Sequence, residues 1–231
     1  PVAHRLVRRG PQVVLYDQRG HGSSTVGSDG FTIPRLGADL KAVLEAVDVR
    51  DAVVAGHSMG GMTVQSLATH HPDVVAERAR ALVLVATAAS GLGRGRGDAG
   101  ARRMVTSVGV ERLLRSGFGH ALLRGAVGVA VHRNHLVLTR DLFVACASEA
   151  RDGWLTAMQA MDLREGIAAI GVPTTVIVGS ADRVTPPDRA AELVATIPGA
   201  RLVTLDGAGH MLPLETPDEV AEALTVIDAV A

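Results

Sequence analysis

Ser58 lies in the run Gly-His-Ser-Met-Gly, residues 56–60, with a glycine two residues before it and another two residues after it. An apolar run typical of a buried strand precedes this serine, and apolar residues at helical spacing follow it. Glycines at these positions remove the β-carbons that would collide where a strand reverses into a helix, so the turn would hold the serine hydroxyl exposed. The backbone N–H of Met59 would then lie in the first turn of the helix, where it can stabilise a developing oxyanion. The pattern predicts that Ser58 is a nucleophile.

A serine hydroxyl is a weak nucleophile at neutral pH, so it needs a base to accept its proton and an acid to orient that base. Asp182 follows the apolar run 174–179, and His210 follows the apolar run 201–205. Each therefore lies just past the carboxyl end of a predicted parallel strand, at the edge where open α/β sheets assemble their sites. We expect both side chains to reach Ser58 there.

The elements that must position these residues alternate between strand and helix along the chain. Helical spacing predicts helices over 33–47 and 188–197, and a further helix that ends at Gly10. Alternation of this kind predicts an α/β fold with a mostly parallel sheet and right-handed crossovers. The five apolar runs that predict its strands are 13–17, 52–56, 81–86, 174–179 and 201–205.

The interval 90–165 breaks this alternation because it holds several helical patterns and no credible strand. We predict a helical cap inserted between two strands of the core, with residues 1–89 forming the first part of the core and residues 166–231 the second. The inner face of the cap would cover a pocket that prefers an apolar acyl or alcohol group. The residues expected on that inner face include Met104, Val108, Leu113, Leu142 and Trp154.

Length and composition fit one domain and exclude several classes of partner. The 231 residues are 47 % hydrophobic with a formal net charge of -1, which gives no overall field to attract nucleic acid. No apolar run reaches the roughly 18 residues of a membrane span, so stable membrane insertion is not expected. The single cysteine, Cys146, cannot form an intramolecular disulfide, and no signal peptide is visible. We expect a cytoplasmic protein that acts on a small molecule and uses no cofactor or metal.

Four segments of the chain resemble the successive signature segments of the α/β-hydrolase superfamily, particularly its small serine esterases. The resemblance implies that Ser58 is the nucleophile, His210 the general base and acid, and Asp182 the carboxylate that orients the histidine. The chain order of serine, acid and histidine is also that of the family, and the interval 90–165 corresponds to the family's variable cap. The segments are VVLYDQRGHGSS at 13–24, VVAGHSMGG at 53–61, VPTTVIVGSADRVTPP at 172–187 and LDGAGHMLPLETPDEVAEAL at 205–224.

The sequence departs from that family before its first predicted strand. The family's first three strands, and the His-Gly segment that supplies a second oxyanion donor, have no counterpart here. The third of those strands lies between the fourth and the fifth in the family's sheet, so its loss would leave a central gap. We expect either a fragment of a longer hydrolase or direct pairing of residues 13–17 with residues 52–56. Loss of one oxyanion donor would lower turnover on the order of 100- to 1000-fold.

Residues near the predicted nucleophile have structural explanations that compete with chemistry. His57 precedes Ser58, but adjacent residues on a tight turn point apart, so we expect a structural role for it. Asp17 and Arg19 follow the first predicted strand and could bind substrate. An ion pair that stabilises the turn is the simpler explanation for these two residues.

Two further groups of polar residues are also expected to be structural. Glu215 could replace Asp182 as the acid, but its place at the start of the last predicted helix favours capping. The segment His-Arg-Asn-His, residues 132–135, could suggest a metal site. No nearby acid or cysteine completes a ligand set there, so solvated residues of the cap are expected.

The sequence therefore predicts a serine hydrolase that cleaves a carboxylic ester or related acyl compound through an acyl-enzyme. Thioesters, lactones, amides and carbon–carbon bonds stay open as alternatives, because fold analogy cannot choose among them. Cofactor-free perhydrolysis or haloperoxidase-like chemistry is a second enzymatic alternative that relatives of this family carry out with the same triad. A non-catalytic binding module is a third, which applies if the chain is complete as given. The oligomeric state stays open.

Overall fold

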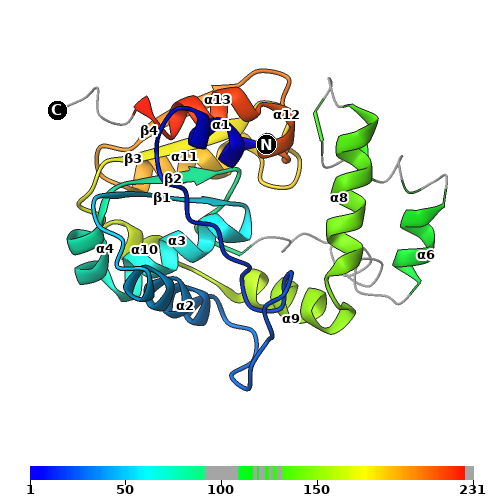
Figure 1. The fold of residues 1–231 in the computed structure, drawn as a ribbon, viewed down its shortest axis with the longest axis horizontal. Coiled ribbons are helices and arrows are strands. Elements are labelled where there is room, and N and C mark those ends of the chain that lie inside the picture. The colour runs from blue at the N-terminus through cyan, green and yellow to red at the C-terminus, as the bar shows by residue number, and fades with distance from the viewer. Residues whose placement is uncertain (92–108, 117–118, 120–122, 125–126, 129–131, 227–231) are drawn as a thin grey trace.

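Four parallel strands form a sheet at the centre of the molecule, in the order β1-β2-β3-β4 (Figure 1). The computed structural model describes residues 1–91, 109–116, 119, 123–124, 127–128 and 132–226. Every pair of neighbouring strands is parallel, so each connection crosses from one end of the sheet to the other. The strands are β1 (Ala52–His57), β2 (Ala79–Val85), β3 (Thr174–Gly179) and β4 (Arg201–Leu205).

The two central strands are mainly apolar because helices cover both of their faces. Every residue of β3 is buried, and so is every residue of β2 except Arg80. The carboxyl ends of the four strands point toward one side of the molecule, the side on which α8 and α12 lie in Figure 1. This common direction brings the residues that follow β1, β3 and β4 to one edge of the sheet. The predicted α/β fold with a parallel sheet is confirmed.

Helices pack on both faces of the sheet and bury an apolar core on each. One core holds Leu36, Met62, Ile167 and Leu193. The other holds Leu212 and Val220, with partly buried Val2 packed against it. The helices of the first face are α2 (Ile33–Ala46), α3 (Met59–His70), α10 (Arg164–Ile167) and α11 (Pro187–Thr196), and α4 (Pro72–Arg78) links α3 to β2. Those of the second face are α1 (Val2–Arg8), α12 (Leu212–Glu215) and α13 (Pro217–Ala223).

Among the described residues between β2 and β3, three further helices are present: α6 (Val110–Arg115), α8 (Arg133–Ala145) and α9 (Ser148–Ala160). The chain enters and leaves this region at one place, because Leu163 N–H donates to Ala89 O and Gly91 N–H donates to Met161 O. Trp154 anchors α9 to the core through an edge-to-face contact with Phe31, with ring centroids 4.9 Å apart. The limits of a cap at residues 90 and 165 stay a prediction.

Of the five residues predicted for the inner face of the cap, the structure describes three, and only one of these three is buried. Trp154 is buried, with an exposed fraction of 2 %, whereas Leu142 on α8 is 59 % exposed and Leu113 on α6 is 38 % exposed. The prediction is therefore wrong for these two leucines, whose helices leave them in contact with solvent. Met104 and Val108 lie outside the described residues.

The predicted strand over residues 13–17 is not present. This segment has no strand hydrogen bonds, and Val14 and Leu15 are 47 % and 77 % exposed. β1 pairs with β2 along one edge, and no described segment pairs with its other edge, so the expected pairing of residues 13–17 with 52–56 is wrong. An apolar, β-branched run forms a strand only where a neighbouring strand accepts its hydrogen bonds and covers its side chains.

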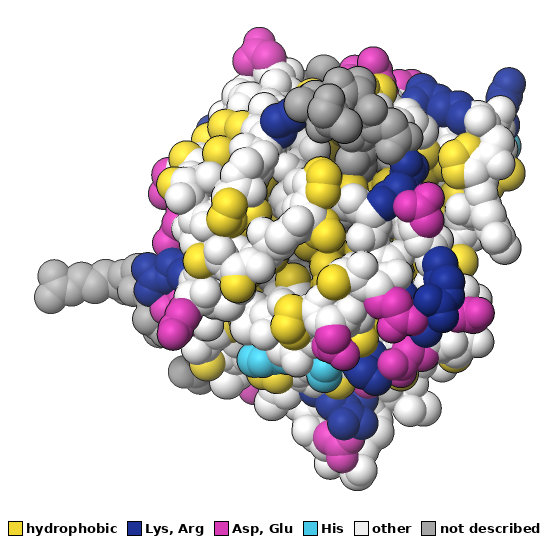
Figure 2. All heavy atoms as spheres, turned by 90° about the vertical axis from the view of Figure 1, so that its left-hand side faces the viewer, with side chains coloured by type: hydrophobic (Ala, Val, Ile, Leu, Met, Phe, Trp, Pro, Cys, Tyr) yellow, Lys and Arg dark blue, Asp and Glu magenta, His cyan; other side chains and the backbone are white. Residues whose placement is uncertain are grey.

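Figure 2 shows the side of the molecule at which the amino ends of the strands lie. Apolar side chains gather near the centre of this face, and charged side chains of both signs lie toward its edges. None of the helices within the described part of the chain is both long and apolar enough to cross a membrane.

Candidate active site

Ser58 lies at the turn between the end of β1 and the start of α3, with a backbone that only a tight turn imposes. Its φ of 53° and ψ of -118° fall outside the regions that non-glycine residues normally adopt. Two hydrogen bonds hold this conformation: Ser58 N–H donates to Val85 O at 2.9 Å, and the Thr87 hydroxyl donates to Ser58 O at 2.8 Å. Both partners come from β2 and the residues directly after it, so the neighbouring strand sustains the strained turn.

Glycine is required at two positions of this turn, and one of them differs from the prediction. A β-carbon at Gly56 would lie 2.1 Å from Gly60 O, as the strand-to-helix reversal requires. A β-carbon at Gly60 would meet nothing closer than the Gln18 amide nitrogen at 3.8 Å, so the expected collision there is wrong. The second required glycine is Gly61, where a β-carbon would lie 2.6 Å from the Thr87 side chain. The paired glycines after Met59 were a visible signal for this contact.

His210 connects Ser58 to Asp182 by two hydrogen bonds. His210 Nε2 lies 3.0 Å from Ser58 Oγ, and His210 Nδ1 lies 2.9 Å from Asp182 Oδ2. The exposed fractions of His210 and Asp182 are 6 % and 3 %, so both side chains are largely shielded from water. The structure thus brings together three residues separated by up to 152 positions in the chain. A proton can pass from the serine hydroxyl to an imidazole whose other nitrogen faces a carboxylate.

Asp182 is held by several donors in addition to His210. Its Oδ1 accepts from Val184 N–H at 2.8 Å and Thr185 N–H at 2.9 Å, and its Oδ2 accepts from the Thr185 hydroxyl at 2.7 Å. Burial alone raises the pKa of Asp182, but the hydrogen bond and charge of His210 and the Thr185 donors outweigh burial and lower this pKa below its ordinary value. The carboxylate is therefore ionised at neutral pH and favours a proton on His210 Nδ1.

His57 was expected to have a structural role, and it holds the backbone of His210, a partner that the sequence did not indicate. Its Nε2 lies 2.7 Å from His210 O, so the neutral imidazole donates to the backbone of the histidine facing Ser58. Burial and the charge that His210 can carry lower the pKa of His57 to about 4. His57 is therefore neutral at physiological pH. Its ring does not point away from the site, because the loop of His210 folds back over the end of β1.

Met59 is the first residue of α3, so its N–H lies at the helix terminus as expected. The first N–H groups of a helix have no acceptor inside the helix and carry its positive partial charge. The geometry therefore allows Met59 N–H to donate to an oxygen atom near Ser58 Oγ. Its role as an oxyanion donor stays a prediction.

The ion pair expected between Asp17 and Arg19 is wrong. The Arg19 guanidinium instead forms two hydrogen bonds with Asp39 on α2, at 2.6 and 2.7 Å. Asp17 accepts from Ser23 N–H at 2.9 Å and closes its own turn. Both residues therefore fix the loop after residues 13–17, and the carboxylate on α2 could not have been identified from the local sequence.

The residues predicted not to bind metal are placed as follows. His132 Nδ1 accepts from Asn134 N–H at 3.3 Å at the start of α8, and the rings of His132 and His135 are 6.1 Å apart. Within the described ranges, no group of three or more histidine, cysteine, aspartate or glutamate side chains is arranged to hold a metal ion.

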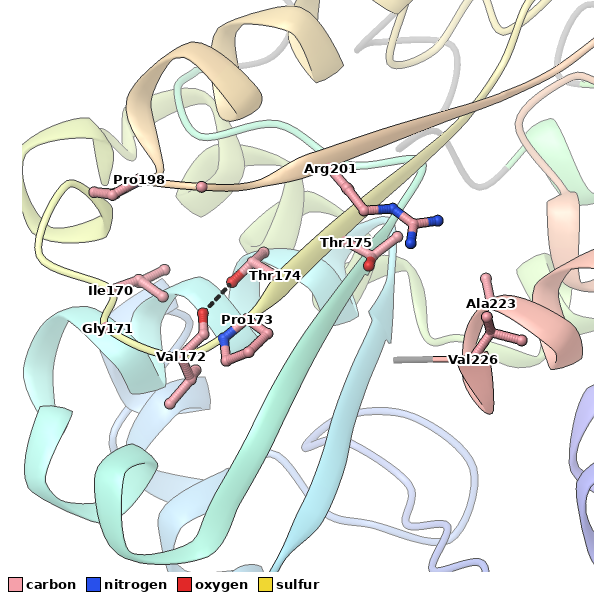
Figure 3. A pocket seen from close by; sticks show the side chains of 11 residues that line it. Ile170, Gly171, Val172, Pro173, Thr174, Thr175, Pro198, Arg201, Ala223 and Val226 are labelled. Atoms are coloured by element: carbon pink, nitrogen blue, oxygen red, sulfur yellow. Dashed lines mark hydrogen bonds between the residues drawn. The ribbon is translucent and has the colours of Figure 1, made fainter. Parts of the chain in front are cut away.

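A cavity of about 400 Å³ lies at the opposite end of the sheet from Ser58 (Figure 3). Its lining includes Thr174 and Thr175 at the start of β3 and Arg201 at the start of β4. The Thr174 hydroxyl donates to Val172 O at 3.1 Å, drawn as the dashed line in Figure 3. Because the carboxyl ends of these strands carry Asp182 and His210, this cavity is separate from the candidate active site.

Comparisons with known proteins match nearly the whole chain. The family model described as the alpha/beta hydrolase family matches residues 1–223. A pimeloyl-(acyl-carrier protein) methyl ester esterase from Xanthomonas campestris pv. campestris is 31 % identical over 97 % of this chain and 87 % of its own. A non-heme chloroperoxidase from Burkholderia pyrrocinia is 27 % identical over 97 % of this chain and 84 % of its own.

A solved structure is also similar to nearly the whole chain. The crystal structure of the enol-lactonase from Burkholderia xenovorans LB400 is 29 % identical, has a TM-score of 0.76, and covers 92 % of this chain and 78 % of its own. The family match, the parallel sheet and the serine at the strand-to-helix turn agree with one another. The chain belongs to the alpha/beta hydrolase family and is a hydrolase.

Proposed function

We propose that this enzyme is a serine hydrolase that cleaves a carboxylic ester or a related acyl compound through an acyl-enzyme intermediate. The observation that carries the proposal is the connection of Ser58 Oγ to His210 Nε2 at 3.0 Å and of His210 Nδ1 to Asp182 Oδ2 at 2.9 Å. This geometry is that of a nucleophile, its base and the acid that orients the base. The similarity to a methyl ester esterase supports an ester as the substrate class.

The first half of the reaction forms the acyl-enzyme. Ser58 Oγ attacks the carbonyl carbon of the ester while His210 Nε2 accepts the serine proton. The negative charge that develops on the carbonyl oxygen is stabilised by Met59 N–H at the start of α3. Collapse of the tetrahedral intermediate breaks the bond to the alcohol oxygen, and His210 Nε2 returns the proton to the departing alcohol. The acyl group remains on Ser58.

The second half releases the acid. Water attacks the acyl carbon as His210 Nε2 accepts one of its protons, and that proton then passes to Ser58 Oγ when the serine leaves. Asp182 stays ionised throughout because its pKa is lowered below the ordinary value. It keeps the proton of neutral His210 on Nδ1 and stabilises the imidazolium that forms in each half-reaction.

The test of this proposal is an acid quench during turnover of a p-nitrophenyl ester series. Wild-type protein should release p-nitrophenol, and intact-mass measurement should find one acyl group, located on Ser58 by peptide mapping. His210→Ala should lower the turnover by several orders of magnitude. An acyl group found on a residue other than Ser58, or turnover that persists in His210→Ala, would contradict the proposed mechanism.

A second candidate activity is favoured by the similarity to a non-heme chloroperoxidase. We propose that hydrogen peroxide can replace water in the second half of the reaction, so that the acyl-enzyme releases a peracid and regenerates Ser58. The same three residues carry this step, with His210 accepting the peroxide proton. Peracetic acid formation from acetate and peroxide, lost in Ser58→Ala, would support it; wild-type protein that hydrolyses esters but forms no peracid would contradict it.

The cellular setting belongs to the same proposal. Cys146 is a free cysteine, and burial raises the pKa of its thiol above the ordinary value. A buried, protonated thiol suits a reducing compartment. We therefore place the reaction of a small ester in the cytoplasm, where fractionation of the native host would test it.

A further inference from the structure

The Glu215 carboxylate accepts three hydrogen bonds from backbone N–H groups, none of which its sequence position predicted. Glu215 Oε2 lies 2.7 Å from Gly128 N and 2.9 Å from Gly209 N, and Glu215 Oε1 lies 2.8 Å from Met211 N. Glu215 is the last residue of α12, and Met211 directly precedes that helix. The expectation that Glu215 caps the last helix is therefore wrong, because its three donors all lie outside α13.

Two of these donors lie on either side of His210. The peptide group between His210 and Met211 is held at both ends, because its N–H donates to Glu215 and its carbonyl accepts from His57 Nε2 at 2.7 Å. The N–H of Gly209 is held by the same carboxylate. The backbone that carries the imidazole is thus fixed before and after His210, which sets where its Nε2 can lie relative to Ser58 Oγ.

The third donor, Gly128, belongs to the region between β2 and β3 in which the cap is predicted. A β-carbon at Gly128 would lie 2.2 Å from Gly207 O, and one at Gly209 would lie 2.3 Å from Gly128 N. Two glycines therefore allow the backbone of this segment to touch the loop of His210. Val127 is buried, with an exposed fraction of 7 %. One carboxylate joins the loop of His210 to a segment more than 80 residues earlier in the chain.

We propose that Glu215 is a positioning residue that fixes the backbone of His210 and fastens the Val127–Gly128 segment to it. This inference rests on the proposed function, because it assigns Glu215 a role through the base of that reaction. A carboxylate suits the role since it offers two oxygens that only accept, and a charged acceptor forms the stronger hydrogen bonds. An amide in its place would have one acceptor oxygen and would turn an NH₂ group toward at least one backbone N–H.

The test compares two isosteric substitutions in the full chain. Glu215→Gln replaces the three-way acceptor, and Glu219→Gln makes the same chemical change at an exposed residue of α13. We measure the second-order rate of fluorophosphonate labelling at Ser58 and the kcat and KM for p-nitrophenyl acetate. Glu219→Gln should match wild type, whereas Glu215→Gln should lower the labelling rate and kcat about 10- to 100-fold with little change in KM, because displacement of a catalytic group by about 1 Å costs on the order of 100-fold.

A double-mutant comparison separates positioning of His210 from other roles. In the His210→Ala background, Glu215→Gln should change the residual labelling rate by less than about twofold, because the group that it positions is absent. An equal loss in both backgrounds would show that Glu215 acts through something other than His210 and would overturn the inference.

Gly128→Ala provides a variant that keeps the carboxylate and disturbs the contact of the Val127–Gly128 segment with the loop of His210, because its β-carbon would lie 2.2 Å from Gly207 O. Like Glu215→Gln, it should lower kcat and the labelling rate, here several-fold. If Glu215→Gln does not fold, Gly128→Ala alone tests the inference. An unchanged rate in Gly128→Ala would overturn the coupling to the Val127–Gly128 segment. Wild-type protein that is not labelled at all would overturn the proposed function and this inference with it. Labelling of wild type, Glu219→Gln and Glu215→Gln at the same rate would overturn this inference alone.

Discussion

At the scale of single residues, the chemistry depends on which groups share protons and which only hold others in place. Ser58, His210 and Asp182 form one connected line, and Asp182 receives four hydrogen bonds in all. Their types and their positions after apolar runs were enough to predict them from the sequence. The contribution of His57 could not be predicted, because it depends on the backbone carbonyl of His210, 153 positions away.

Asp182→Asn should lower the kcat for p-nitrophenyl acetate roughly 10⁴-fold, the size seen when the corresponding aspartate is changed in a serine protease. The asparagine NH₂ group would face His210 Nδ1 and favour the tautomer that cannot accept the serine proton. Asp188→Asn, an exposed acid on α11, is the matched control and should leave kcat unchanged. Turnover near the wild-type value in Asp182→Asn would assign the acid role to another carboxylate.

His57 should make the stability of the protein depend on pH. Folded His57 takes up a proton only near pH 4, whereas a histidine in the unfolded chain does so near 6.5. Between these values the unfolded state binds more protons. The contribution of His57 to the free energy of unfolding is therefore complete above about pH 6.5 and decreases as the pH drops toward 4. The contribution is at most about 3 kcal/mol, less where solvent reaches the ring.

Urea unfolding of wild type and His57→Gln between pH 4 and pH 7.5 measures this contribution. The free-energy difference between the two proteins should shrink as the pH is lowered through that window. A difference that stays constant across the window would show that His57 binds its proton equally in both states.

At the scale of elements, the strand-to-helix turn places Ser58, and its glycines are not equivalent. Gly61→Ala should destabilise the protein, because its β-carbon would lie 2.6 Å from Thr87, whose hydroxyl holds the turn. Gly60→Ala should keep or slightly raise the melting temperature, since alanine is favoured over glycine in a helix by about 1 kcal/mol. Thermal unfolding of both variants measures the two melting temperatures. Equal destabilisation of the two variants would contradict the requirement for glycine at 61 and not at 60.

The anchoring of α9 gives a second prediction at this scale. Trp154→Ala should cost about 3–5 kcal/mol, because it empties a buried site packed against Phe31. Leu142→Ala should change stability by less than about 0.5 kcal/mol, because this leucine is largely exposed on α8. Chemical denaturation measures the free energy of unfolding of both variants. Comparable losses of stability in the two variants would contradict this prediction.

The elements also show where sequence reasoning succeeds and where it stops. Strands 52–57, 174–179 and 201–205 were found within one residue of their observed limits, because each is a short run rich in apolar and β-branched residues. Residues 13–17 have the same composition and form no strand, because composition does not show whether a partner strand lies beside them. The hydrogen bonds of Glu215 could not be predicted for a related reason, because its donors at 128, 209 and 211 come together only in the folded chain.

At the scale of the whole molecule, the parallel sheet converts distant segments into one site. The loops after β1, β3 and β4 meet at the carboxyl edge, and two apolar cores hold the strands in register from either face. α1 is joined to α13 by the ion pair between Arg5 and Asp218, which connects the first helix to the second helix after His210. The fold class and family followed from the sequence, whereas the arrangement of the helices between β2 and β3 did not.

The central claim is that Ser58 is the nucleophile of this hydrolase, and fluorophosphonate labelling tests it most directly. Wild-type protein should gain the mass of one phosphonyl group, which peptide mapping should locate on Ser58. Ser58→Ala should fold with an unchanged melting temperature, because it removes one oxygen from a turn held by backbone contacts, and it should gain no mass under the same conditions. Labelling of Ser58→Ala at the wild-type rate, or folded wild-type protein that takes up no probe, would contradict the claim.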